Sequence, residues 1–150
     1  MAALNRRTFL QTGLVLGAAT PWRGARACEY FSPTLRITHP WTRATPMGAP
    51  FAVLAMRFDE VSQDDRLLAV ETPVAEAVVY MPGGAGAQGV ELPLDIPAGR
   101  ETVLLDAGPH LRLLRLTQAL EVARSYPLRL VFEKGGTVKA LLNVDYARFS

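Results

Sequence analysis

The side chains best suited to chemistry in this sequence are two histidines, four methionines and a single cysteine. His110 stands where the turn Asp106–Pro109 passes into the leucine-rich segment Leu111–Leu116. Successive side chains on a strand point to opposite faces, so His110 and Arg112 are expected to share one face. Whatever chemistry the chain performs is therefore expected at the start of this strand.

Cys28 is the only cysteine, so an intrachain disulfide is excluded. Four roles remain open for it: a lipid-modified residue, an inert terminal thiol, an intermolecular disulfide, or a soft metal ligand. Ala25 and Arg26 directly before it match a lipid-attachment signal poorly. The sequence does not choose among the other three roles.

Catalytic motifs are absent from the sequence. It contains no glycine-rich phosphate cradle before a helix, no CxxC or HExxH motif, and no Gly-x-Ser-x-Gly elbow. One cysteine with two histidines makes no specific nucleophile pattern. We therefore expect that the protein is not an enzyme.

The N-terminus has the pattern of a twin-arginine export signal. Arg6 and Arg7 precede Phe9-Leu10 and a mildly apolar run, Thr12–Ala19, which is too short to span a bilayer stably. Ala25-x-Ala27 fits a signal-peptidase site with cleavage before Cys28. This pattern predicts a signal peptide over residues 1–27, a domain over 28–150 and a periplasmic location; the alternative is a basic amphipathic helix.

Composition indicates one globular domain. The 150 residues are 49% hydrophobic and 20% charged, which is enough apolar material for a packed core. Four of the sixteen basic residues precede Cys28, and the remaining 12 basic and 14 acidic groups give a net charge of −2. A slightly acidic domain lacks the basic surface that nucleic acid requires.

Eight short apolar segments separated by turn residues favour an all-β, antiparallel β-sandwich or barrel. Pro40 is expected to end the first strand, Trp41–Pro50 to form a loop, and Thr117–Tyr126 to make at most one helical turn. In the last two strands the buried faces are Leu128, Leu130 and Phe132, and Val138, Ala140, Leu142 and Val144. The expected strands are Leu35–His39, Phe51–Phe58, Arg66–Glu71, Val74–Met81, Glu101–Leu105, Leu111–Leu116, Leu128–Glu133 and Thr137–Asp145.

Over roughly Ile37 to Val144 the chain resembles the periplasmic copper chaperones of the PCu(A)C type. The resemblance implies a cupredoxin-like β-sandwich that binds Cu(I) and delivers copper to a cuproprotein client such as a respiratory oxidase. The segments that carry it are Pro40–Pro46, Asp65–Leu67 with Pro73–Ala75, Ile96–Gly99, Gly108–Leu113 and Tyr126–Lys134.

The family binds copper through a histidine, a later methionine, and a His-x-Met motif further along, a set of soft ligands that suits Cu(I). The second histidine corresponds to His110. The first falls at or beside Tyr80, the first methionine falls in the segment 88–91, which has none, and the second is replaced by Arg112. The fixed charge of Arg112 opposes a cuprous ion.

The resemblance therefore implies a degenerate copper site at the His110 end, with substitute metal ligands drawn from Met81, His39 and Cys28. Met81 is expected to reach the site only if its loop moves. Structural roles remain open for Met81 as an apolar strand-end residue, for His39 as a backbone-bonded ring and for His110 as a turn histidine. The rival function is a metal-free, protein-binding module that has lost its copper site.

Overall fold

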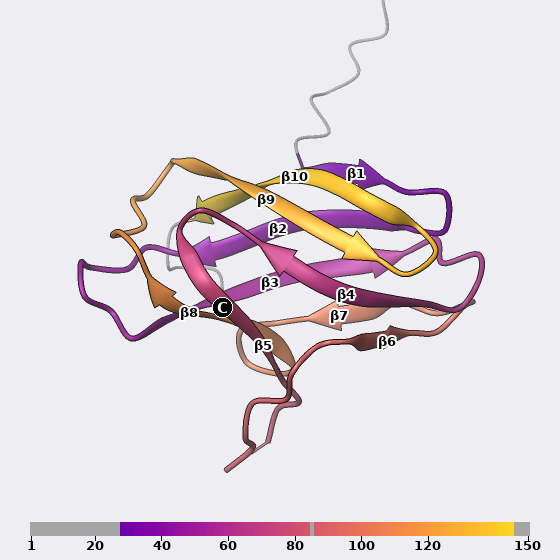
Figure 1. Cartoon of the computed structure of the whole chain (residues 1–150), viewed down its shortest axis with the longest axis horizontal. Helices are drawn as coiled ribbons and strands as arrows, with labels where there is room; N and C mark the ends of the chain where they lie inside the picture. Colours follow the sequence, from indigo (N-terminus) through magenta and orange to yellow (C-terminus); the bar gives the residue numbers. More distant parts are fainter. Residues whose placement is uncertain (1–27, 85, 146–150) are drawn as a thin grey trace, which may run out of the picture.

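The computed structural model describes residues 28–84 and 86–145, and these contain ten strands and no helix (Figure 1). The predicted signal peptide, residues 1–27, lies outside the described residues. In the described ranges no helix has the length and apolar character needed to cross a membrane. The strands are β1 (Glu29–Phe31), β2 (Arg36–Arg43), β3 (Phe51–Asp59), β4 (Asp65–Glu71), β5 (Ala75–Met81), β6 (Leu94–Ile96), β7 (Thr102–Leu104), β8 (His110–Leu116), β9 (Ser125–Phe132) and β10 (Gly136–Asp145).

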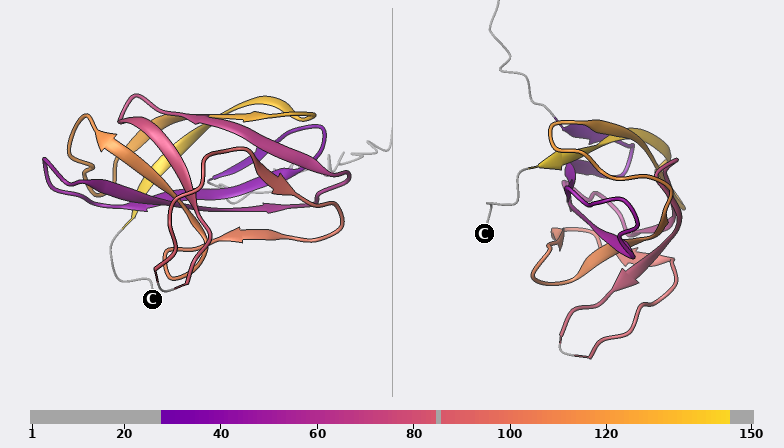
Figure 2. Two further views of the ribbon diagram at one scale, coloured as in Figure 1. Left: turned by 60° about the horizontal axis from the view of Figure 1, so that its bottom comes forward. Right: turned by 90° about the vertical axis from the view of Figure 1, so that its left-hand side faces the viewer.

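The strands form one strongly curved sheet in the order β5-β8-β3-β2-β10-β9-β4-β6, with β1 added to β2 and β7 added to β3. The sheet wraps into a nearly closed barrel, and the loop between β5 and β6 projects from its body (Figures 1 and 2). The all-β fold predicted from the sequence is confirmed. Two short strands, β1 and β6, add to the eight expected, and one pair, β2 with β10, is parallel.

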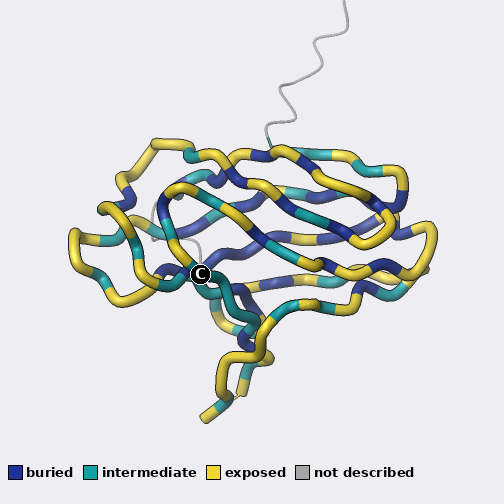
Figure 3. The backbone as a smooth tube through the Cα atoms, in the orientation of Figure 1, coloured by how far each residue is buried: buried dark blue, intermediate teal, exposed yellow. Residues whose placement is uncertain are grey.

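The core lies inside this barrel. It is formed by side chains that point inward at every second position along the strands. Leu128, Leu130 and Phe132 of β9 are each no more than 2% exposed, as expected from their spacing. Along the strands buried residues alternate with exposed ones (Figure 3). Phe132 packs edge-to-face on Phe58 with ring centroids 5.8 Å apart. The predicted buried faces of β9 and β10 are confirmed.

The first of the expected strands is β2 of the structure, and Pro40 does not end it, contrary to the sequence prediction. β2 continues to Arg43, because its register against β3 shifts between Thr38 and Trp41. His39 has a φ of 49° inside this irregular stretch. A bulge leaves residues outside the hydrogen-bond ladder, so a proline without an N–H group is tolerated there.

The segment Thr117–Tyr126, expected to make at most one helical turn, contains no helix, and Pro127 does not end it. Leu120 pairs with Thr45 in an isolated bridge, and β9 begins at Ser125. Pro127 lies inside β9, where it faces Leu141 on one side. The pairing of β9 with β4 begins only at Arg129, so the missing N–H group of Pro127 costs that ladder nothing.

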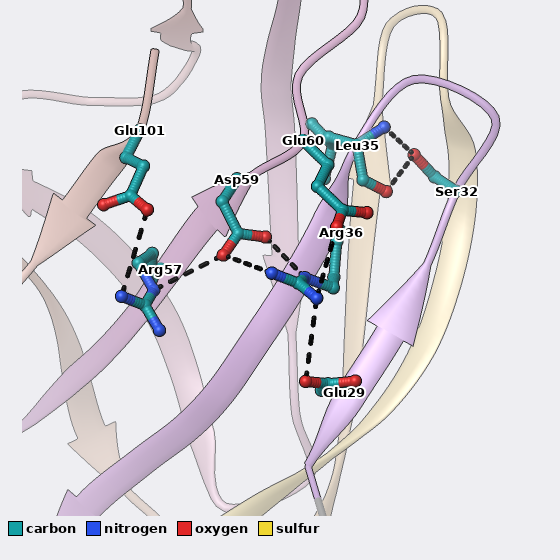
Figure 4. Close-up of polar contacts among 8 residues, drawn as sticks. All are labelled: Glu29, Ser32, Leu35, Arg36, Arg57, Asp59, Glu60 and Glu101. Carbon is teal, nitrogen blue, oxygen red and sulfur yellow. Dashed lines mark hydrogen bonds and ion pairs between the residues drawn. The ribbon is translucent and has the colours of Figure 1, made fainter. Parts of the chain in front are cut away.

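Charged side chains fix the open end of β1, β2 and β3 (Figure 4). Arg36 makes a bidentate contact with Asp59, at 2.7 and 2.9 Å, and ion pairs with Glu29 and Glu60. The Arg36 hydrogen bonds lower the pKa of the buried Asp59 carboxyl, with Arg57 also contributing. This network ties the three strands together.

Asp65, 3% exposed, joins three parts of the chain through one carboxylate. It accepts hydrogen bonds from Thr34 Oγ1 at 2.7 Å, from the backbone N–H groups of Arg66 and Lys134 at 2.8 Å, and from that of Gly135 at 2.9 Å. The β1–β2 turn, the start of β4 and the β9–β10 hairpin are thereby held at one point.

Candidate metal centre

Alternation along β8 separates the core residues from a candidate site. Leu111 and Leu113 are fully buried in the barrel, whereas His110 and Arg112 lie on the opposite face, as the sequence predicted. β5 runs antiparallel beside β8, and its register places Met81 directly opposite His110. Directly opposed side chains have Cβ atoms about 4.5–5.5 Å apart. His110 and Met81 are therefore neighbours on one face.

One ring nitrogen of His110 makes a hydrogen bond and the other makes none. Nδ1 lies 2.9 Å from the carbonyl oxygen of Gly108, and since a carbonyl only accepts, Nδ1 carries the proton. Nε2 is buried and has no hydrogen-bond partner. In the neutral ring Nε2 presents a lone pair, which is the form in which imidazole binds a metal. Buried polar atoms are rarely left without a partner, so this nitrogen is the candidate atom for binding a ligand.

Met81 reaches this place by strand register, and no loop movement is required. Tyr80, its neighbour, packs against the core, so Met81 points to the other face, where it is 8% exposed. A side chain on Gly89 would begin 3.4 Å from Met81 Sδ. Gly89 lies within the segment where the resemblance places the family's first methionine. The sulfur of Met81 thus stands beside the position where that methionine is missing.

Above His110 and Met81 lies a hollow of about 450 Å³. Gly83, Gly84, Gly86 and Ala87 line one side of it, and the turn Asp106–Gly108 lines the other. Gly83 lies against the turn so closely that an added Cβ would come within 3.1 Å of the backbone nitrogen of Pro109. The glycine-rich loop and the turn together border the site.

Arg112 also lines the hollow, and it brings a positive charge. Its guanidinium carbon lies 4.0 Å from the ring centroid of Phe51, and its Nε is buried without a hydrogen-bond partner. Asp106, the carboxylate of this hollow, is ion-paired with Arg43 at 2.5 Å. Arg112 therefore has no carboxylate partner within the described part of the chain.

The other two predicted ligands lie together, but elsewhere. His39 Nε2 is 2.9 Å from Asp145 Oδ2, and its ring stacks on Trp41. The His39 backbone N–H donates to the Cys28 carbonyl. Neither residue lines the hollow at His110.

The Cys28 thiol is also engaged locally. Its Sγ lies 2.9 Å from the side-chain nitrogen of Asn143. Burial raises the pKa of this thiol, the Asn143 hydrogen bond opposes the shift, and the charge of Asp145 adds to it. The thiolate form that binds metals is thus disfavoured.

The four predicted ligands therefore divide into two pairs, with His110 and Met81 at one site and His39 and Cys28 at another. Among the described residues no cluster of three or more His, Cys, Asp and Glu side chains is suited to hold a metal. The pair at His110 is the one that has an unpartnered nitrogen and a hollow in front of it.

Residues 35–144 match the family model named LpqE-like. The chain belongs to the LpqE-like family. Several solved structures have the same fold. The copper-bound PCuAC domain from PmoF2 is 26% identical, with a TM-score of 0.69, and the match covers 79% of this chain and 97% of that domain. No curated protein matches the chain.

Two further structures support the LpqE-like fold. The apo PCuAC domain from PmoF1 is 27% identical, with a TM-score of 0.69 over 79% of this chain and 98% of that domain. The solution structure of Cu(I)-bound DR1885 from Deinococcus radiodurans is 24% identical, with a TM-score of 0.65 over 84% and 85% of the two chains. The PCuAC resemblance predicted from the sequence is confirmed.

Proposed function

We propose that this LpqE-like protein is a copper chaperone that binds Cu(I) through His110 Nε2 and Met81 Sδ. It would deliver the ion to a cuproprotein such as a respiratory oxidase. The observation that carries the proposal is the buried, unpartnered Nε2 of His110 directly across the strand pair from a methionine. Related PCuAC domains have been solved with copper bound, which supports copper as the ion.

The chemistry of the two side chains fits Cu(I). Imidazole and thioether groups bind a metal as neutral, soft ligands. Two protein ligands leave the ion open towards the hollow, so a client's ligands can approach it. A weak, open site suits a protein whose cargo must leave again.

The proposed place of action is the periplasm. The twin arginines, the apolar run and the Ala25-x-Ala27 site support export by the twin-arginine pathway, and Cys28 would then begin the mature chain. The same family and fold support a binding role instead of an enzymatic one.

Titration with Cu(I) against a cuprous chelator, without oxygen, tests the proposal. We expect one ion per chain. His110→Ala and Met81→Leu should each weaken binding by more than the roughly 10–100-fold that outer-shell substitutions cost, because each removes a ligand itself. His39→Ala is the matched control and should leave the affinity unchanged.

Two results would contradict the assignment. If His110→Ala binds copper as wild type does while Cys28→Ser or His39→Ala does not, the site lies at the other pair. If wild type binds no copper at all, the metal-free protein-binding module is the correct function.

A further inference from the structure

Two buried polar atoms without hydrogen-bond partners belong to residues that line the same hollow. One is His110 Nε2, which the proposed function uses, and the other is Arg112 Nε, which it does not. Resting on that function, we propose that the site takes Cu(I) together with a soft anion, a thiolate, and that Arg112 binds this anion. The ligand set would then be one imidazole, one thioether and one sulfur from outside the domain.

The charges in the hollow require an anion. Arg112 contacts the ring of Phe51, but it has no carboxylate partner within residues 28–84 and 86–145. Asp106, which also lines the hollow, is already paired with Arg43. Because His110 and Met81 are neutral, a bare cuprous ion would add a second uncompensated positive charge beside Arg112. A bound thiolate carries one negative charge, so it cancels the charge that the cuprous ion adds and provides an anion beside Arg112.

The coordination chemistry points to sulfur. Cu(I) held by one imidazole and one thioether can accept a further ligand, and a soft ion prefers a soft donor. As the external sulfur coordinates copper, its thiol proton passes to solvent. The N–H group on Arg112 Nε can then donate a charge-assisted hydrogen bond to the sulfur.

The hollow has room for such a ligand. Cβ atoms built on Gly84 and Gly86 would meet nothing within 4 Å, so the glycine-rich side leaves open space. A volume of about 450 Å³ admits a cysteine side chain with some of its flanking atoms. Both a small thiol such as glutathione and a cysteine of a partner protein supply this chemistry.

Native mass spectrometry of the copper-loaded protein tests the inference, in a Cys28→Ser background that removes the protein's own thiol. With glutathione added under reducing conditions, we expect a complex of one protein, one copper and one glutathione. Arg112→Leu, which removes the guanidinium without adding a copper ligand, should keep copper but hold glutathione roughly 10- to 100-fold more weakly, the value of a charged hydrogen bond. A peptide with one cysteine, tested in parallel, distinguishes a partner's cysteine from a small thiol.

Arg115→Leu is the matched control, because Arg115 lies on the same strand, is exposed and pairs with Glu76. It should retain glutathione like wild type. Arg112→Lys keeps the charge but lacks the N–H group at Nε, and its retention of glutathione should fall between those of wild type and Arg112→Leu. Without added thiol, Arg112→Met should bind Cu(I) more tightly than wild type, because it removes the positive charge and adds a thioether.

The outcomes separate the two claims. Equal retention of both thiols by wild type and Arg112→Leu, with copper bound, overturns the role of Arg112 and leaves the copper function standing. If copper-loaded wild type retains neither glutathione nor the cysteine peptide, the inference is also overturned and the copper function still stands. Absence of copper in every arm overturns the proposed function, and the inference with it.

Discussion

Replacing Asp65 by Asn tests whether the carboxylate that joins three parts of the barrel is essential. The carboxylate accepts four hydrogen bonds, two at each oxygen. An amide keeps one oxygen, so two buried donors would face an NH₂ group instead of an acceptor. Hydrogen bonds to a charged group contribute about 1.5–3 kcal/mol each. After allowance for the relief of burying a charge, the expected loss is about 3–5 kcal/mol.

A loss of that size is a large share of the roughly 5–15 kcal/mol by which a domain is stable. Urea unfolding followed by tryptophan fluorescence measures it by linear extrapolation. Asp95→Asn is the control: its side chain is 86% exposed and pairs with Arg66 at the surface, so the change should stay within about 1 kcal/mol. If Asp65→Asn also stays within 1 kcal/mol of wild type, the reasoning is refuted.

The same carboxylate predicts a pH dependence. Burial would raise the pKa of Asp65, but the hydrogen bonds from Lys134, Thr34, Arg66 and Gly135 together outweigh it and lower the pKa. A group with a lowered folded-state pKa stabilises the fold above its unfolded pKa, about 3.9 for Asp. That contribution is lost as the pH falls through the folded value. The free-energy difference between wild type and Asp65→Asn should therefore shrink in acid.

Two further predictions concern the core and the N-terminus. Phe132→Ala should cost about 3–5 kcal/mol in urea unfolding, as large core truncations do, whereas Lys139→Ala, on the exposed face of β10, should change stability by no more than about 0.5 kcal/mol. A Phe132→Ala protein as stable as wild type would contradict the assigned core. Arg6→Lys combined with Arg7→Lys should hold the precursor in the cytoplasm, as cell fractionation would show, and the exported wild type should begin at Cys28 by N-terminal sequencing; a start near Met1 would disprove cleavage there.

The parts of the fold that the sequence predicts well are those where side-chain alternation is regular. Leu128, Leu130 and Phe132 show a period of two, and the structure buries all three. Pro40 misleads because a bulge removes the need for its N–H group, and a bulge depends on the pairing with β3, which is a tertiary contact. Short strands such as β1 and β6, each three residues long, have too few residues to show a period.

The candidate site, like the fold, is predicted from the sequence only where it depends on alternation along a single strand. The common face of His110 and Arg112 follows from alternation along one strand, and it was predicted. The position of Met81 depends on how β5 aligns with β8, and this alignment cannot be read from either segment alone. Once the alignment is known, Tyr80 is assigned to the core and Met81 to the site. The separation of His39 and Cys28 from His110 depends on other long-range pairings, those of β2 with β1 and with β3.

The place of β10 between β2 and β9 has a consequence for how the protein is made. Before residues 136–145 have left the ribosome, the strands β2, β3, β8 and β5 have no connection in the sheet to β9, β4 and β6. A nascent or truncated chain therefore presents unpaired edges on β2 and β9, and such edges favour aggregation. A premature stop codon before Gly136 should thus yield insoluble protein instead of a smaller domain.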